Sequence, residues 1–189
     1  MKKDAKEKVF IVLEGLSGVG KTTIGKILAE KIGAEFYKTP ALMFASCREI
    51  IDEKADATAR FFFYLAGVIQ SSVEISHILE TRSVVCDRYI LTTLCYHRAL
   101  GIAIDISDDL FFKFLLKPNY TFLITCEENK RIERLFRRGL SLNDKKEREF
   151  QIEKKFLDEY RKYNLIEIDN SDDNPILAVE KILQHISRK

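Results

Sequence analysis

Residues 14–23 read EGLSGVGKTT and contain Gly15, Gly20, Lys21 and Thr22 in the pattern G-x-x-x-x-G-K-[ST]. The apolar run VFIVL precedes this stretch and the amphipathic run IGKILAEKI follows it, as a buried strand and a helix would. In that context the backbone N–H groups surround a phosphate, Lys21 reaches the β- and γ-phosphates, and Thr22 is a ligand for Mg²⁺. The stretch therefore predicts a nucleoside triphosphate site. The residues expected to contact the nucleotide are Gly15, Ser17, Gly18, Val19, Gly20, Lys21, Thr22 and Thr23.

Runs rich in β-branched and aromatic residues recur outward from this loop, at residues 9–13, 34–37, 83–86, 120–125 and 165–168. Helical patterns lie between them, and apolar residues at helical spacing in 58–80 predict one long helix packed on a sheet. The alternation predicts a three-layer α/β fold with a largely parallel sheet. Since no Gly/Pro/Ser-rich linker or repeat interrupts the 189 residues, we expect a single domain over 1–189.

The composition is that of an ordinary globular chain, with 46% hydrophobic and 32% charged residues. A formal net charge of +2 gives no reason to expect nucleic-acid or membrane binding. The first apolar run is too short for a signal peptide or a membrane span. The four cysteines show no C-x-x-C spacing, which is typical of reduced thiols rather than a metal site. We therefore expect a cytoplasmic protein without a nucleic-acid or membrane partner.

A basic segment departs from this composition, because residues 130–148 hold eight basic side chains against three acidic ones. Arg134, Arg137 and Arg138 are spaced three or four apart on one helical face, just before Gly139, a residue suited to a hinge. The alternative interpretation is a solvated helix followed by a polar loop. Beside a phosphate loop, the pattern favours a mobile basic lid over about residues 134–148 that binds anionic groups.

A second polar site follows the predicted strand at 83–86, where the chain runs into Asp87, Arg88 and Tyr89. Asp87 is placed to orient Mg²⁺ through water and to fix Arg88, and Arg88 is placed to bind an acceptor anion. The alternative is a structural ion pair at the end of the strand. The N-K-x-D and D-x-x-G motifs of GTPases do not occur in the chain.

Taken in order, the motifs resemble the thymidylate kinase family of nucleoside monophosphate kinases. They are EGLSGVGKTT, KTP, FFFYLAG, CDRY, RLFRRG and IDNS. The stretch around residues 38–76 is most similar to the branch that includes mitochondrial UMP-CMP kinase. The resemblance implies a P-loop kinase fold, with a five-stranded parallel sheet flanked by helices. It also implies ATP and Mg²⁺ on one side of the sheet end and a monophosphate acceptor on the other.

The resemblance implies roles for several side chains. On the acceptor side, it places Phe63 against the base, Tyr96 near the sugar, and Lys38 and Arg88 at the acceptor phosphate. The alternatives are that Phe63 is one more core residue of the FFFY run and that Lys38 is a surface lysine. Because the phosphate loop has no arginine at its variable positions, the lid arginines are expected to supply the cation, with Arg134 and Arg137 at ATP. The implied catalytic set is Lys21, Asp87, Arg88, Arg134 and Arg138, and the implied metal set is Thr22 and Asp87. The FFFYLAGVI helix is a candidate homodimer interface, as in thymidylate kinases.

The chain departs from the family at three positions. Ser17 stands where an acidic residue usually meets the acceptor sugar, Thr39 replaces a Glu, and Gly67 replaces the Arg that reads the thymine carbonyl. The expected activity is transfer of the γ-phosphate of ATP to a pyrimidine deoxynucleoside monophosphate, with dTMP as the family default. A deoxynucleoside kinase is the first alternative. The second is a non-catalytic nucleotide-binding regulatory module on the same fold.

Overall fold

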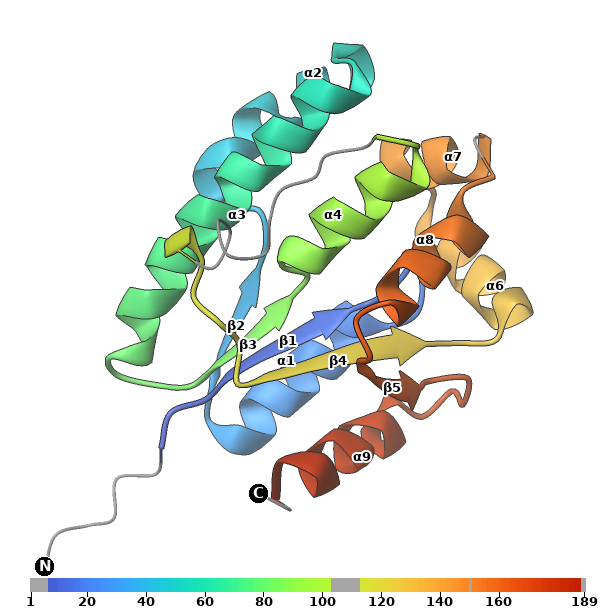
Figure 1. Cartoon of the computed structure of the whole chain (residues 1–189). Coiled ribbons are helices and arrows are strands. Elements are labelled where there is room, and N and C mark those ends of the chain that lie inside the picture. Colours follow the sequence, from blue (N-terminus) through green and yellow to red (C-terminus); the bar gives the residue numbers. More distant parts are fainter. Residues whose placement is uncertain (1–6, 103–112, 150, 188–189) are drawn as a thin grey trace, which may run out of the picture.

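A five-stranded parallel sheet forms the centre of the computed structural model, which describes residues 7–102, 113–149 and 151–187 (Figure 1). The strands are β1 (Phe10–Glu14), β2 (Glu35–Lys38), β3 (Val84–Asp87), β4 (Tyr120–Thr125) and β5 (Ile166–Asp169). Their spatial order is β2-β3-β1-β4-β5, and every neighbouring pair is parallel. The predicted α/β fold and all five predicted strands are confirmed. Four of the strands lie one residue further along the chain than the apolar pattern indicates.

Strand β1 occupies the middle of the sheet, and all five of its residues are buried. Leu13 pairs with Asp87 of β3 on one side, and Glu14 pairs with Leu123 of β4 on the other. From β1 the chain first builds β2 and β3 on one side of it and later β4 and β5 on the other. The carboxyl end of β1 therefore lies at the point where the strand order reverses, where open α/β sheets bind ligands.

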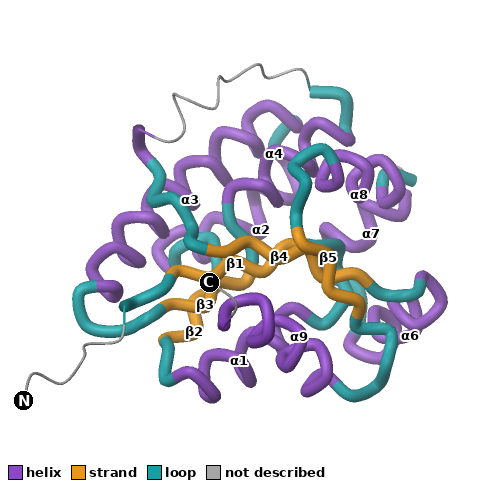
Figure 2. Tube along the Cα trace, turned by 60° about the horizontal axis from the view of Figure 1, so that its bottom comes forward, coloured by secondary structure: helices purple, strands orange, loops and turns teal. Residues whose placement is uncertain are grey.

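Helices cover both faces of the sheet and give three layers (Figure 2). One face carries α1 (Lys21–Ile32) and α9 (Pro175–Ser187), and the other carries α3 (Ala57–Leu79), α4 (Ile90–Ala99) and α8 (Glu153–Arg161). The described residues also form η1 (Leu42–Phe44), α2 (Ala45–Lys54), α6 (Glu128–Arg138) and α7 (Leu142–Glu149). Helices α2, α6 and α7 lie toward the end of the sheet at which the strand arrows point (Figure 1). This end of the sheet, with the helices around it, is therefore where a site can be built.

Helix α3 confirms the long helix predicted at 58–80 and begins one residue earlier. Asp56 caps it, because its Oδ1 accepts hydrogen bonds from the N–H groups of Thr58 and Ala59, at 2.7 and 3.0 Å. Its inner face, which includes Phe61, Val68 and Ile75, is buried against the sheet. Of the helices in the described part of the chain, α3 is the one that is long and apolar enough to cross a membrane. This is weak evidence for a span, since core helices of globular proteins pass the same test.

Candidate functional site

A cleft of about 770 Å³ lies at the carboxyl ends of β1, β2 and β3. It brings together side chains that are far apart in the sequence, from the phosphate loop, α2, α3, α4 and the lid segment. The predicted site residues that line it are Ser17, Gly18, Gly20, Lys21, Thr22, Thr23, Lys38, Asp87, Arg88, Tyr96, Arg134 and Arg138. Of the other predicted residues, Gly15 and Val19 are buried in the loop, and Arg137 lines a separate hollow. Phe63 is absent from both sets of described lining residues.

The phosphate loop joins β1 to α1 with a backbone that fits tightly under β4. Gly15 has a φ of 139°, and a Cβ there would lie 2.3 Å from the carbonyl oxygen of Ile124. Helix α1 begins after Gly20. In the described structure no side chain caps the N–H groups of its first turn. The N–H groups of this turn are therefore directed at the cleft mouth and suited to a phosphate.

Lys21 is buried at the floor of the cleft, with 5% of its surface exposed. Its Nζ donates a 2.7 Å hydrogen bond to the carbonyl oxygen of Leu16. Burial, and then the positive charge of Arg88, lower the pKa of Lys21 to about 7. A bound polyphosphate would supply the counter-charge that favours the protonated form.

Thr22 and Asp87 connect the start of α1 to the end of β3. The Thr22 hydroxyl donates to Asp87 Oδ2 at 2.5 Å, while Asp87 Oδ1 is buried and has no hydrogen-bond partner among the described residues. A hydroxyl beside an unsatisfied carboxylate oxygen is a donor set that fits Mg²⁺. The described residues hold no cluster of three or more His, Cys, Asp and Glu side chains suited to a metal. A cation here would therefore need nucleotide phosphate oxygens and water as further ligands.

Arg88 lies at the floor of the cleft, between the half lined by the phosphate loop and the half expected to hold the acceptor. Its φ is 71°, in the left-handed region that few side chains adopt. Its guanidinium donates at 3.2 Å to the Gly15 carbonyl, to Thr92 Oγ1 and to Ser17 Oγ. Among the described contacts, none is a hydrogen bond to Asp87. The loop and α4 hold Arg88, and the predicted fixing of Arg88 by Asp87 is not seen.

Glu14 lies beneath Arg88 and was not singled out in the sequence. It is fully buried and accepts hydrogen bonds from Tyr89 N–H at 3.0 Å and Thr92 Oγ1 at 2.5 Å. Burial raises the pKa of this carboxyl, and the bonds from Thr92 and the charge of Arg88 oppose the rise. The carboxyl group is a structural anchor for the turn that carries Arg88. In the sequence it directly follows the predicted strand at 9–13, as the first residue of the loop stretch, and nothing signalled this role.

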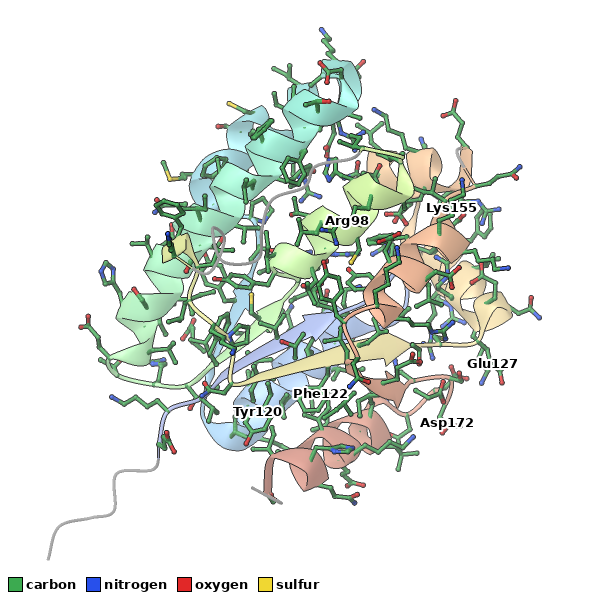
Figure 3. All side chains as sticks on the ribbon, viewed as in Figure 1. Arg98, Tyr120, Phe122, Glu127, Lys155 and Asp172 are labelled. Carbon is green, nitrogen blue, oxygen red and sulfur yellow. The ribbon has the colours of Figure 1, made fainter. Side chains whose placement is uncertain are left out.

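The three lid arginines differ in their surroundings. Arg134 bonds to the carbonyl oxygens of Asn170 and Asp172, at 2.9 and 3.1 Å, whereas Arg138 pairs with Asp144 at 2.8 Å. Arg137 is exposed and pairs with Glu133. Arg134 and Arg137 share a second hollow of about 400 Å³ at the loop between β5 and α9, where Figure 3 labels Asp172. Arg138 therefore lines the main cleft, Arg137 lines the second hollow, and Arg134 lines both.

In the acceptor half of the cleft, Lys38 is exposed at the end of β2 and Tyr96 is buried on α4. The Tyr96 hydroxyl accepts a 3.1 Å hydrogen bond from Arg60 Nη2. The Phe63 ring packs instead on Phe44, with ring centroids 5.5 Å apart. Its neighbour Tyr64 lines the cleft, so the aromatic side chain of α3 that faces this half is one residue later than predicted.

Gly67 lies where Pro40 and Phe44 come close to α3. A Cβ at this position would lie 2.6 Å from Pro40 Cβ and 3.5 Å from the Phe44 ring. The described packing leaves no room here for the arginine that the family resemblance places at this position. Pro40 and Phe44 thus occupy the space that an arginine side chain would need at this position.

Two buried polar residues in the acceptor half were missed from the sequence. Arg60 is 3% exposed and its Nε has no hydrogen-bond partner among the described atoms. The His97 ring bonds to the Thr93 carbonyl through Nδ1 at 2.7 Å, and its Nε2 is buried without a described partner. Burial lowers the pKa of His97 to about 4, so the ring is neutral at pH 7. A charged residue at a core-facing position of a helix was the available signal for Arg60.

Comparison with known proteins shows the family. The family model described as thymidylate kinase matches residues 13–182. A probable thymidylate kinase of Methanocaldococcus jannaschii is 30% identical over 173 residues, which is 87% of this chain and 88% of that protein. A probable thymidylate kinase of Sulfurisphaera tokodaii is 29% identical over 165 residues, covering 85% and 86%.

Solved structures agree at the level of the fold. Thymidylate kinase from Ehrlichia chaffeensis superposes with a TM-score of 0.70 at 22% identity, covering 95% of this chain and 98% of that one. Thymidylate kinase from Candida albicans gives a TM-score of 0.72 at 19% identity, covering 96% and 92%. With the phosphate loop, the Asp87-Arg88 turn and the basic helix around one cleft, the chain belongs to the thymidylate kinase family of ATP-dependent nucleoside monophosphate kinases.

Proposed function

We propose that this kinase transfers the γ-phosphate of ATP to a pyrimidine deoxynucleoside monophosphate, with dTMP as the first candidate. The observation that carries the proposal is that the phosphate loop and Arg88 line one cleft, with the Arg88 guanidinium hydrogen-bonded to Gly15 and Ser17 of the loop. Phosphoryl transfer between two anions requires them to be held in line and their charge neutralised. Because the acceptor phosphate oxygen is already anionic, no strong general base is needed, which agrees with Thr39 in place of a carboxylate.

On the donor side, we assign the N–H groups at the start of α1 to the β-phosphate of ATP. Lys21 would exchange its hydrogen bond with Leu16 for one with the β- and γ-phosphates. Arg138 is placed to neutralise charge on the transferred group, since it faces the main cleft. Arg134 and Arg137 are assigned to the nucleotide end of the site, beside the β5–α9 loop. Mobility of the lid over residues 134–148 is part of this proposal.

Mg²⁺ is assigned to Thr22 and, through water, Asp87. The support is the unsatisfied Asp87 Oδ1 beside the Thr22 hydroxyl. An ion held by these two residues would offset the negative charge of the phosphates. The task of this chain's own residues is to hold the Thr22 hydroxyl with its oxygen toward the cleft, which the hydrogen bond to Asp87 achieves.

On the acceptor side, we assign the acceptor phosphate to Arg88 and Lys38 and the sugar to Tyr96. Gly67 supplies no base contact, so the base edge needs other polar partners. Among the described residues, neither Arg60 Nε nor His97 Nε2 has a hydrogen-bond partner, and both residues line the cleft. One can donate and the other can accept, as the polar edge of a pyrimidine requires. We therefore assign base reading to Arg60 and His97.

The assembly proposed is a homodimer formed through the outer face of α3. Phe62 and Val73 are 54% and 46% exposed there, and Ala66 and Ile69 lie between them at helical spacing. An apolar stripe of this kind on a long helix is suited to pairing with a second copy. The proposal also takes the chain as a single cytoplasmic domain over 1–189, with no nucleic-acid or membrane partner.

The test is coupled ADP release over a panel of nucleoside monophosphates and nucleosides. We expect turnover with dTMP, less with dCMP and UMP, and none with thymidine. Phosphorylation of a nucleoside without any monophosphate would support a deoxynucleoside kinase. Tight ATP binding without turnover of any acceptor would support the regulatory module.

A further inference from the structure

Helix α2 is held to the acceptor half of the cleft by few contacts. Of its ten residues, 45–54, Asp52 is the buried one, whereas Ile50 is 60% exposed. Asp52 is 4% exposed and lines the cleft together with Arg48 and Glu49 of the same helix. The position of α2 over the acceptor half is therefore set largely by what the Asp52 carboxylate contacts.

The Asp52 carboxylate contacts two other helices, α3 and α7. Its Oδ1 accepts a 2.7 Å hydrogen bond from the Tyr64 hydroxyl of α3, and its Oδ2 accepts one at 3.1 Å from Asn143 Nδ2 of α7. Arg60 Nε of α3 lies 3.8 Å from Oδ1, within ion-pair range but beyond a hydrogen bond. Buried carboxylates need partners of this kind because an isolated charge is costly to bury.

Asn143 bridges the two members of this ion pair. Its Nδ2 donates to Asp52, and its Oδ1 accepts a 3.1 Å hydrogen bond from Arg60 Nη2. The reverse orientation of the amide would set a donor against the guanidinium and an acceptor against the carboxylate, so the two partners fix this orientation. Arg60 Nη2 also donates to the Tyr96 hydroxyl. One amide of the lid thus reaches the acceptor-side ion pair and, through it, Tyr96.

This bridge is most of what joins α7 to the acceptor helices. In the described residues, the hydrogen bonds from α7 to α2 and α3 come from Asn143 and from Lys146, which donates to the Asp52 carbonyl. The buried Asp144, in contrast, bonds within the lid, to Ser141 and Arg138. Asn143 therefore belongs to the contact between the lid, on the donor side, and helix α2, which lies over the acceptor half of the cleft.

Resting on the proposed function, we propose that Asn143 is a positioning residue that couples closure of the lid over ATP to closure of α2 over the acceptor. The contact of Asn143 with Asp52 and Arg60 belongs to the closed arrangement, and ATP bound beneath the lid favours it, so that α2 and Tyr96 are held in place. Each substrate then favours the conformation that the other needs, and such coupling is reciprocal. Without the amide, the bond from Lys146 to the Asp52 carbonyl is the described hydrogen bond that remains between α7 and α2, so closure of the lid and closure of α2 are largely uncoupled.

The test is hydrogen exchange with a non-hydrolysable imido analogue of ATP and no acceptor. In the wild type, the analogue should slow exchange at least about fivefold in both 142–149 and 45–54. In Asn143→Ala, it should slow exchange in 142–149 alone. Asn143→Asp, which sets a carboxylate against Asp52, should behave like Asn143→Ala. The control is Lys145→Ala, an exposed residue of the same helix, which should match the wild type.

A rescue separates coupling from a general structural role. The double variant Asp52→Asn, Asn143→Asp exchanges the amide and the carboxylate across the same contact, so it should restore protection of 45–54. The inference is overturned if the analogue protects 45–54 equally in Asn143→Ala, or fails to protect it in the wild type. Because no acceptor is used, a wrong acceptor assignment leaves this result unchanged. The monophosphate panel with the wild type tests that assignment separately.

Discussion

The Thr22 hydroxyl lies 2.5 Å from Asp87 Oδ2 and joins the first turn of α1 to the end of β3. This contact orients the hydroxyl so that its oxygen is available to a cation, while Asp87 Oδ1 has no hydrogen-bond partner in the part of the chain that the structure describes. Asp87→Asn keeps the shape but removes the charge that attracts Mg²⁺ through water. We expect Mg²⁺ affinity and kcat to fall about 10- to 100-fold.

Titration of activity against Mg²⁺ measures this loss, with circular dichroism melts to show that the variant is folded. Asp158→Asn, at an exposed position of α8, is the matched control and should behave as the wild type. An unchanged Mg²⁺ dependence in Asp87→Asn would remove Asp87 from the metal site.

The lowered pKa of Lys21 predicts that ATP binding is accompanied by the uptake of protons. In the free protein the pKa of Lys21 is lowered to about 7 from 10.5, so at pH 8 the side chain is largely neutral. The phosphates favour the charged form and raise the pKa again. ATP is fully ionised at pH 8, because the second phosphate pKa is about 6. Binding should therefore take up close to one proton at pH 8 and fewer at pH 6, where Lys21 is already protonated.

Calorimetry in buffers of different ionisation enthalpy measures this uptake. Lys26→Ala, on the exposed face of α1, should leave it unchanged. Lys21→Ala should abolish turnover and the uptake together. Uptake that is equal at pH 6 and pH 8 would contradict a lowered Lys21 pKa.

The lid arginines should separate kinetically. Arg134 contacts the β5–α9 loop, so Arg134→Ala should raise the KM for ATP about 10-fold with a smaller change in kcat. Arg138 faces the main cleft, so Arg138→Ala should lower kcat about 10²-fold with little change in KM. Steady-state kinetics at saturating acceptor distinguishes the two. The reverse pattern would exchange their assigned roles.

Gly67 should resist even the smallest side chain. Alanine is favoured over glycine in a helix by about 1 kcal/mol, but its Cβ would lie 2.6 Å from Pro40 Cβ. Overpacking costs about 1–3 kcal/mol, so Gly67→Ala should lower the free energy of unfolding. Urea denaturation measures this free energy, and Ala66→Gly at the exposed neighbouring position, compared at a protein concentration at which the chain is monomeric, measures the propensity difference. A Gly67→Ala variant more stable than the wild type would show that Pro40 and Phe44 can move aside at little cost in free energy.

The sequence predicted what depends on local pattern. The strand before Gly15 and the long helix after Asp56 form where their apolar patterns predict them, because each must bury its apolar side chains in the core. The phosphate loop was recognisable because its chemistry needs fixed residues at fixed spacing. Mobility of the lid and the individual side-chain roles stay predictions.

What the sequence did not predict depends on helix rotation and on contacts between distant elements. Phe63 and Tyr64 are adjacent aromatic residues, and only the packing of α3 on Pro40 and Phe44 decides that Tyr64 faces the cleft. Asp52 and Asn143 meet across 91 residues of chain, and neither belongs to a local motif. Partners of this kind follow from the closed arrangement of three elements, which no short window encodes.

The outer face of α3 predicts how the protein assembles. Phe62 and Val73 are 54% and 46% exposed on this face. Phe62→Glu or Val73→Glu would therefore place a charge within the apolar stripe. A carboxylate that must be desolvated at an apolar contact is strongly unfavourable, so either variant should give a monomer where the wild type is a dimer. The fold should persist, because neither side chain is buried in the described chain. Sedimentation velocity over a range of concentrations measures the association. Leu177→Glu, 41% exposed on α9 at the opposite face of the sheet, is the matched control and should stay dimeric. A monomeric wild type, or dimers that persist in both α3 variants, would exclude this face as the dimer interface.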